Sequence, residues 1–287
     1  GFVLEEAIKL GEMINLKIDN MKHQHKSIID GSNEQTSENA EVKTAEVKAE
    51  KKTEKPKKAP KPKAPVELKD YGFVAVCMGK GITNILKDLG VDRVIEGGQT
   101  MNPSTDDILK AVKRVKAKTV YVFPNNKNII MAANQARDLT EDKEIIVIPS
   151  KTVPQGITAL VNFIPDLTPE ENLENMTAEM ERVQTAQITY AVRNTSIDGM
   201  EIHEGDIMAI GDHGMLAVDT SVLGAAKAAL EAMLNEDSEL VTIYYGSDVT
   251  EADAEAFRKQ AEEEFPDKEI ELQYGGQPIY YYMISAE

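Results

Sequence analysis

The chain has 287 residues, 41% of them hydrophobic and 28% charged, which is typical of a soluble globular protein, and no apolar run approaches the roughly 20 residues of a membrane span. Its single cysteine, Cys77, excludes a disulfide framework and fits a reducing, cytoplasmic environment. The net charge of −17 is uneven, because residues 37–65 hold nine lysines and five glutamates and leave −21 on the remainder. An acidic body of this kind is expected to repel nucleic acid and anionic membrane surfaces, and it favours a basic or neutral protein partner or a small molecule.

Residues 1–30 read as one helical segment with an imperfect apolar face, typical of the last helix of an upstream domain. Because the first residue is Gly1 rather than Met, we expect the chain to begin inside a longer protein. His23 and His25 close the segment. On a helix two such side chains point about 200° apart. With no Cys or third His nearby, a solvated helix end is favoured over a metal site.

Residues 31–65 have almost no large apolar side chains and end in Lys-Pro repeats. Such a segment cannot bury enough surface to offset its ordering entropy, so the sequence predicts a flexible linker. A basic tail for anionic partners is the alternative, although glutamates interrupt the lysines.

Residues 66–165 alternate short apolar runs with stretches of helical spacing. This alternation predicts an α/β lobe with a parallel sheet flanked by helices. The expected strands cover 73–77, 91–95, 119–123 and 145–148, and the expected helices cover 82–89, 108–115, 129–139 and 155–163. The turn Gly79-Lys80-Gly81 matches neither a dinucleotide fingerprint nor a P-loop.

Three polar loops follow strands of this lobe, at 97–104, 124–128 and 149–154, and are expected side by side along one edge of the sheet. With backbone N–H groups at helix starts, their side chains suit an anion or a carboxylate. Helix caps and tight turns explain most of the same residues and are the favoured interpretation. General acid–base catalysis has no obvious agent among them. The candidate ligand-binding residues are Gln99, Thr100, Asn102, Ser104, Asn125, Asn126, Lys127, Ser150, Lys151 and Thr152.

Residues 166–287 predict a second α/β lobe in which antiparallel strands are expected. Strands are expected at 187–192, 207–210, 215–218, 240–245, 270–274 and 279–284, helices at 173–183, 221–234 and 250–265, and a turn at 194–199. In the last strand, Tyr280 and Tyr282 would share one face, as an interface or cleft wall or as part of a core edge strand. His213 lies on a glycine-flanked turn, where an ordinary turn residue is favoured over a catalytic one.

Two stretches carry a resemblance to a known family: Gly97-Gly98-Gln99-Thr100-Met101-Asn102-Pro103-Ser104 and Tyr274-Gly275-Gly276-Gln277-Pro278-Ile279-Tyr280. Together they resemble the carboxyl-terminal part of the bacterial fatty acid kinase A family, which is DAK-type, YloV-like and related to dihydroxyacetone kinase. The resemblance covers nearly all of 66–287. It implies a DegV-like two-lobed fold here, preceded in the family by a kinase domain that binds ATP and magnesium and by a middle domain that dimerises.

The resemblance also implies particular sites. Gln99 to Ser104 are similar to a segment with which DegV-like proteins hold a fatty-acid carboxylate, whereas Asn125 to Asn128 and Gly275 to Pro278 depart from the motifs of those proteins. Gln277, Tyr280 and Tyr282 are the expected partner contacts or cleft wall. His23 and His25 match a partial zinc site whose Cys lies upstream of this chain. No cofactor is expected in this chain otherwise.

We therefore expect a non-catalytic domain that docks a DegV-like fatty-acid-binding protein onto the kinase, and we expect the parent protein to form a homodimer through the middle domain. The first alternative is a sensor in which Thr100, Asn102, Lys127 and Ser150 bind a fatty acid or another anion. The second is an intrinsic enzyme that uses His213. Nucleic-acid binding and membrane insertion are not expected.

Overall fold

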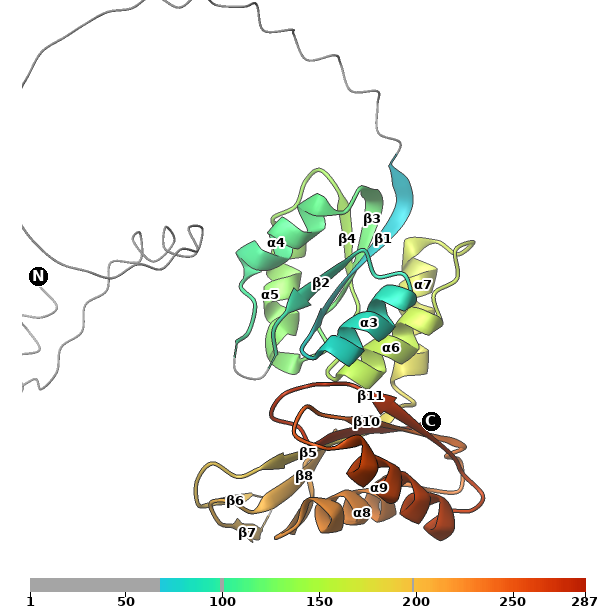
Figure 1. Cartoon of the computed structure of the whole chain (residues 1–287). Coiled ribbons are helices and arrows are strands. Elements are labelled where there is room, and N and C mark those ends of the chain that lie inside the picture. Colours follow the sequence, from blue (N-terminus) through green and yellow to red (C-terminus); the bar gives the residue numbers. More distant parts are fainter. Residues whose placement is uncertain (1–67, 99–100, 198) are drawn as a thin grey trace, which may run out of the picture. The chain divides into compact units, whose positions relative to one another are not determined.

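A computed structural model describes residues 68–98, 101–197 and 199–287 (Figure 1). The segments predicted at 1–30 and 31–65 lie outside these ranges, as do His23, His25, Gln99 and Thr100. The described elements, in chain order, are β1 (Lys69–Cys77), α3 (Lys80–Asp88), β2 (Arg93–Glu96), α4 (Thr105–Arg114), β3 (Ala117–Phe123), α5 (Lys127–Asp138), β4 (Glu144–Val147), α6 (Val153–Val161), α7 (Pro169–Met180), β5 (Gln184–Tyr190), β6 (Thr195–Ile197), β7 (Met200–Ile202), β8 (Ile207–Gly211), β9 (Met215–Asp219), α8 (Val222–Met233), β10 (Leu240–Tyr245), α9 (Glu251–Glu264), β11 (Glu269–Tyr274) and β12 (Tyr282–Ala286).

The first lobe is built on a four-stranded sheet in the order β2-β1-β3-β4, with every pair parallel. This confirms the predicted α/β class with a parallel sheet. Ala75 of β1 lies opposite Val94 of β2 and Phe123 of β3, so β1 is in the interior of the sheet. Its apolar run has no polar interruption because both faces of the strand are covered.

Helices cover both faces of this sheet (Figure 1). One face packs Val76 and Val122 against Ile108 of α4 and Ile129 of α5. The other packs residues such as Phe73 against α3, α6 and α7. The sequence pattern placed α7 with the second lobe, but its Met176 and Met180 belong to the same cluster as Phe73. We therefore count α7 as part of the first lobe, which spans residues 68–180.

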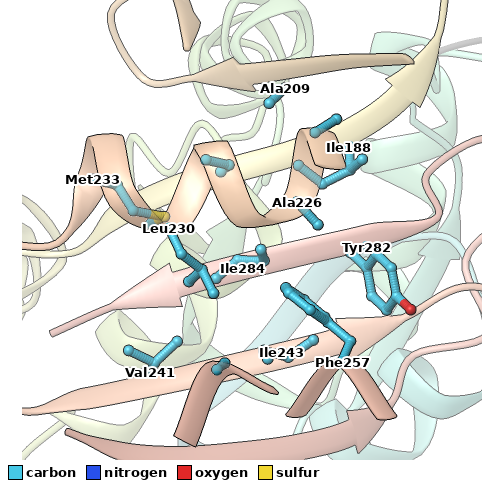
Figure 2. Packing of buried hydrophobic residues seen from close by; sticks show 14 of the residues in the cluster. Ile188, Ala209, Ala226, Leu230, Met233, Val241, Ile243, Phe257, Tyr282 and Ile284 are labelled. Carbon is cyan, nitrogen blue, oxygen red and sulfur yellow. The ribbon is translucent and has the colours of Figure 1, made fainter. Parts of the chain in front are cut away.

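The second lobe, residues 181–287, is a six-stranded mixed sheet in the order β11-β10-β12-β5-β8-β9, in which only β10 and β11 run parallel. One face packs under α8 and α9, and Figure 2 shows Ile188, Ile243 and Ile284 from three strands meeting Leu230 and Phe257 from the helices. Alternate residues of these strands point to the opposite face. The antiparallel pairs confirm the expected character of this lobe.

The opposite face of the second sheet meets the first lobe. Tyr244 and Met283 from that face share a hydrophobic cluster with Phe73. The backbone N–H of Ile82 in α3 donates to the carbonyl oxygen of Gly275 at 3.0 Å. At Gly81 a Cβ atom would lie 1.7 Å from the carbonyl oxygen of Tyr274, so only glycine permits this approach.

Two predictions for the second lobe are wrong in detail. The expected turn at 194–199 includes strand β6, which forms a hairpin with β7 in which Ile197 pairs with Met200. The last strand begins at Tyr282 rather than at 279. Ile279 has a φ of 74°, in the left-handed region, and this interrupts the extended chain before the tyrosines.

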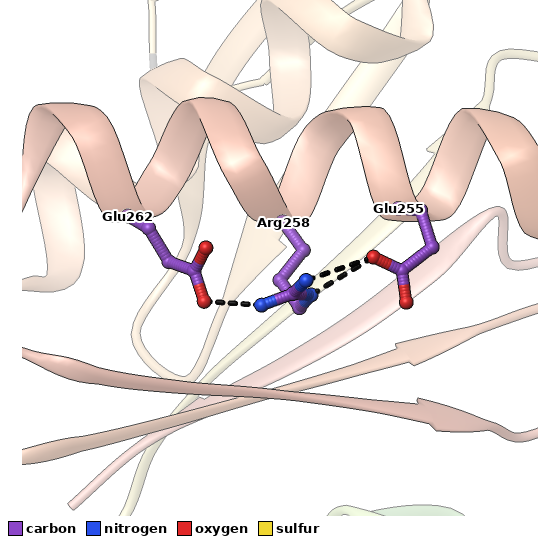
Figure 3. A network of polar contacts seen from close by, with 3 residues as sticks. All are labelled: Glu255, Arg258 and Glu262. Carbon is purple, nitrogen blue, oxygen red and sulfur yellow. Dashed lines mark hydrogen bonds and ion pairs between the residues drawn. The ribbon is translucent and has the colours of Figure 1, made fainter.

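One side of α9 carries a small ion network. Arg258 donates from Nε and Nη2 to Glu255 at 3.1 and 2.9 Å and also bonds Glu262 (Figure 3). These residues are spaced three and four positions apart, so they lie on one side of the helix. Over the described ranges, no helix combines the length and apolar character that a membrane crossing requires.

Candidate functional site

The strand-end loops of the first lobe lie along one edge of its sheet, as the sequence predicts. Asn125, after β3, has a φ of 53° and is 7% exposed. Its Nδ2 donates to the carbonyl oxygen of Val76 in β1 at 3.0 Å, and its Oδ1 accepts from the hydroxyl of Ser150 at 2.8 Å. Ser150 follows β4 and is fully buried. The two side chains therefore tie the ends of three strands together and satisfy each other.

Three further candidate residues cap helices. Ser104 forms a capping box with Asp107 at the start of α4. Asn126 accepts from the backbone N–H of Asn128 at the start of α5, and Thr152 accepts from that of Gln155 at the start of α6. These hydrogen bonds agree with the favoured interpretation, in which caps and turns explain the polar loops.

A small cavity of about 50 Å³ lies between these loops and the second sheet. Asn125 and Asn126 line it from the first lobe, and Gln277, Tyr280 and Met283 line it from the second. Gln277 is 3% exposed and donates from Nε2 to the carbonyl oxygen of Tyr244 at 2.9 Å. Its Oε1 is buried and has no hydrogen-bond partner among the described residues.

A larger pocket of about 370 Å³ opens beside this cavity. The first lobe contributes two lysine side chains, an amide and a hydroxyl, and the second lobe contributes polar side chains of β5 and the turn after β8. The polar residues are Asn126, Lys127, Lys151, Thr152, Thr185, Gln187, Thr189 and Asp212. Four of the ten predicted ligand-binding residues, Asn126, Lys127, Lys151 and Thr152, meet in this pocket.

Two other candidates, Asn102 and Tyr282, do not line this pocket. Asn102 lines a different pocket, next to β2 and α4. Tyr282 was expected to share a face with Tyr280, as a cleft wall or as part of a core edge strand; its ring packs on Phe257 in the core under the helices, with 5.0 Å between ring centroids, whereas Tyr280 lines the cavity. The late start of β12 is the cause, because it breaks the alternation that would have placed Tyr280 and Tyr282 on one face.

The contribution of β5 to the pocket was not predicted from the sequence. Thr185, Gln187 and Thr189 alternate with Ala186 and Ile188, so the strand has one polar and one apolar face. The apolar face packs under the helices and the polar face lines the pocket. The alternation of polar and apolar residues along β5 could have predicted a polar face on this strand.

The turn that carries His213 offers no catalytic arrangement. His213 is exposed, and the carboxylate of its neighbour Asp212 accepts from the backbone N–H of Thr185 at 2.6 Å and from the hydroxyl of Thr185 at 2.7 Å. Asp212 is thus used to hold the start of β5. Nothing in these contacts favours the enzyme alternative.

The chain is similar to known proteins over its whole length. Residues 72–287 match the family model FakA-like_C, which describes the C-terminal region of fatty acid kinase A-like proteins. Protein YloV of Bacillus subtilis (strain 168) is 44% identical over 287 residues, which are 100% of this chain and 47% of that protein. An uncharacterized protein of Staphylococcus aureus (strain USA300) is 38% identical with the same coverage. The chain therefore spans about half the length of these curated relatives.

Solved structures resemble the fold at low sequence identity. The fatty acid kinase B3 protein of Streptococcus pneumoniae, solved with linoleic acid, has a TM-score of 0.51 and 13% identity, and the match covers 76% of this chain and 99% of that one. The fatty-acid-binding protein DegV of Bacillus subtilis has a TM-score of 0.52 and 8% identity, with the same coverage. These likenesses confirm the DegV-like two-lobed fold.

Proposed function

Because the chain belongs to the FakA-like C-terminal family, we propose that residues 68–287 form a non-catalytic domain that docks a DegV-like fatty-acid-binding protein. Phosphorylation of the fatty acid, with ATP and magnesium, is assigned by this proposal to the part of the relatives that this chain does not span. Dimerisation through an upstream domain and zinc at His23 and His25 stay predictions, since those residues lie outside the described ranges.

The observation that carries the proposal is the size of the cavity between the strand-end loops and the second sheet. At about 50 Å³ it is far smaller than the roughly 300–1,000 Å³ of small-molecule pockets, so a fatty acyl chain does not fit there. Asn125 and Ser150 direct their hydrogen bonds to each other rather than to open space. Because this cavity has no room for a lipid, the domain is better suited to bind a lipid carrier than to hold a fatty acid between its strand-end loops.

Isothermal titration calorimetry tests this proposal. The 287-residue chain is titrated with the DegV-like fatty-acid-binding protein of the same organism, once loaded with oleate and once delipidated. We expect saturable binding of the loaded carrier. The absence of binding at high micromolar concentration would overturn the docking function.

A second candidate, anion binding, is supported by the 370 Å³ pocket. Lys127 and Lys151 line it, and neither forms an ion pair within the described part of the chain. Asn126 is 7% exposed, and its Nδ2 donates to no acceptor among the described residues. Two cations and an amide donor suit a phosphate or a carboxylate.

Thermal unfolding in the presence of phosphate or octanoate tests the second candidate. We expect either anion to raise the melting temperature of the wild type and to lose this effect in Lys151→Gln. Lys116→Gln is the matched control, because Lys116 is also exposed but lies outside the pocket. An equal response of both variants would contradict anion binding at this site.

A further inference from the structure

A groove of about 280 Å³ on the second lobe lies apart from the cleft between the lobes. It is formed where α8 and α9 begin beside the start of β12. Leu223, Phe257 and Tyr281 supply apolar walls, and Asp248 and Asp253 supply carboxylates. We call it the Tyr282 groove, after the tyrosine at its base.

Tyr282 is the residue in this groove that lacks an expected partner. It is 3% exposed, and its hydroxyl forms no hydrogen bond within the described ranges. Figure 2 shows the ring beside Phe257, with the oxygen directed away from the labelled core side chains. The hydroxyl oxygen is not enclosed by the protein, so an occupant of the groove can reach it and supply a partner. Burial and the nearby Asp253 raise the pKa of Tyr282 to about 12, so the hydroxyl stays neutral at physiological pH.

The two carboxylates of the groove also lack cations. Asp253 accepts from the hydroxyl of Thr250 at 2.7 Å, and Asp248 accepts from the hydroxyl of Ser247 at 3.4 Å. Over the described residues, neither carboxylate forms an ion pair. An acidic groove without its own cation is complementary to a positive charge.

The second lobe as a whole is also strongly negative, which adds to the attraction of the groove for a positive charge. Residues 181–287 hold six basic and 22 acidic residues, a net charge of −16, whereas residues 68–180 hold 13 basic and 15 acidic residues, a net charge of −2. A positive segment of a partner is therefore attracted to this lobe, and anionic lipid or nucleic acid is repelled.

The walls of the groove restrict the chemistry of its occupant further. Leu223 is 40% exposed at the rim, and the aromatic rings of Phe257 and Tyr281 line the interior. A long basic side chain fits both features, because its aliphatic stem packs on apolar walls while its head meets the carboxylates. An arginine or lysine can also donate to the free hydroxyl oxygen of Tyr282.

We propose that the Tyr282 groove binds an arginine or lysine side chain from a basic segment of the docked fatty-acid-binding protein. This inference rests on the docking function proposed above and names the surface that performs it. The groove lies on the helix-covered side of the second sheet, so docking there leaves the cleft between the lobes untouched.

The test compares groove variants of the 287-residue chain by calorimetry with the oleate-loaded DegV-like protein. Asp253→Asn should raise Kd about tenfold, as expected for loss of a charge-assisted contact. Tyr282→Phe keeps the ring and should raise Kd about threefold. The matched control is Asp142→Asn, the same charge change at an exposed site of the first lobe, and it should leave Kd unchanged.

A further variant guards against a folding effect of Asp253→Asn, since Asp253 lies in the first turn of α9. Leu223→Lys adds a cation at the exposed rim and should weaken binding by repelling the partner's basic side chain. Unchanged affinity in all three groove variants, with normal binding by the wild type, would overturn the groove and leave docking intact. If the wild type itself does not bind, the docking function and the groove both fail.

Discussion

The hydroxyl of Ser150 donates to Oδ1 of Asn125 at 2.8 Å, and the backbone N–H of Asn125 donates to the same hydroxyl oxygen at 3.1 Å. This reciprocal pair joins the loop after β3 to the loop after β4, and Asn125 extends the link to Val76 in β1. These two buried polar side chains therefore hold the loops together, which leaves little of their hydrogen-bonding capacity for a ligand.

Ser150→Ala is expected to lower the free energy of unfolding by about 1–3 kcal/mol, because it leaves the buried N–H and Oδ1 of Asn125 without partners. Urea denaturation measures the change. Ser196→Ala is the control, since Ser196 is exposed in β6 and should change stability by less than about 0.5 kcal/mol. Equal stability of the two variants would contradict the structural role of Ser150.

Gly81→Ala is expected to disturb the contact between the lobes. The added Cβ would lie 1.7 Å from the carbonyl oxygen of Tyr274, so α3 must move away from β11. We expect a loss of about 1–3 kcal/mol or more, measured by thermal unfolding. Asn84→Ala, at an exposed position of the same helix, should leave stability nearly unchanged. A normal melting temperature for Gly81→Ala would argue against this approach of the backbones.

Stability is expected to fall in alkaline solution. Burial raises the pKa of Cys77 from 9.0 to about 11 and those of Tyr121 and Tyr282 from 10.0 to about 12. In the unfolded chain these groups lose their protons at lower pH than in the folded chain. Their contribution is therefore complete below about pH 9 and is lost as the pH rises to 12. Denaturation at fixed temperature across this range measures the slope, which Tyr282→Phe should reduce above pH 10. A slope that is the same in the variant would contradict the shift assigned to Tyr282.

Arg258→Ala is expected to change the free energy of unfolding by less than about 1 kcal/mol. Its partners Glu255 and Glu262 are partly exposed on α9, where water and salt weaken ion pairs. Phe257→Ala, one residue earlier but 1% exposed, should cost about 3–5 kcal/mol in the same denaturation experiment. A loss of unfolding free energy well above about 1 kcal/mol for Arg258→Ala would contradict this weak contribution of the ion network.

The order of strands and helices in the first lobe could be predicted because its apolar runs are short and each is followed within two residues by Gly or Pro. The edge at which Asn125 and Ser150 meet follows from the parallel arrangement, since carboxyl ends of such strands lie together. The hydrogen-bond partners of each polar side chain in these loops could not be predicted. Ser104 directs its hydroxyl into a capping box, whereas Asn126 caps a helix and still leaves an amide donor free.

The second lobe shows why strand faces are harder to predict than strands. Alternation along 279–284 placed Tyr280 and Tyr282 together, but the left-handed conformation of Ile279 delays the strand and changes which tyrosine faces the core. A non-glycine residue with positive φ has no clear sequence signal. The alternation from Thr185 to Thr189 predicts one polar and one apolar face for β5. It does not predict that the polar face meets the first lobe, because that contact depends on packing between segments far apart in the chain.

Native mass spectrometry of the 287-residue chain, alone and mixed with the oleate-loaded DegV-like protein, tests the docking function most directly. We predict that the chain alone carries no lipid and that the mixture forms a complex in which the mass of one fatty acid stays with the carrier. A fatty acid retained by the chain alone, or no complex with the carrier, would contradict the docking function.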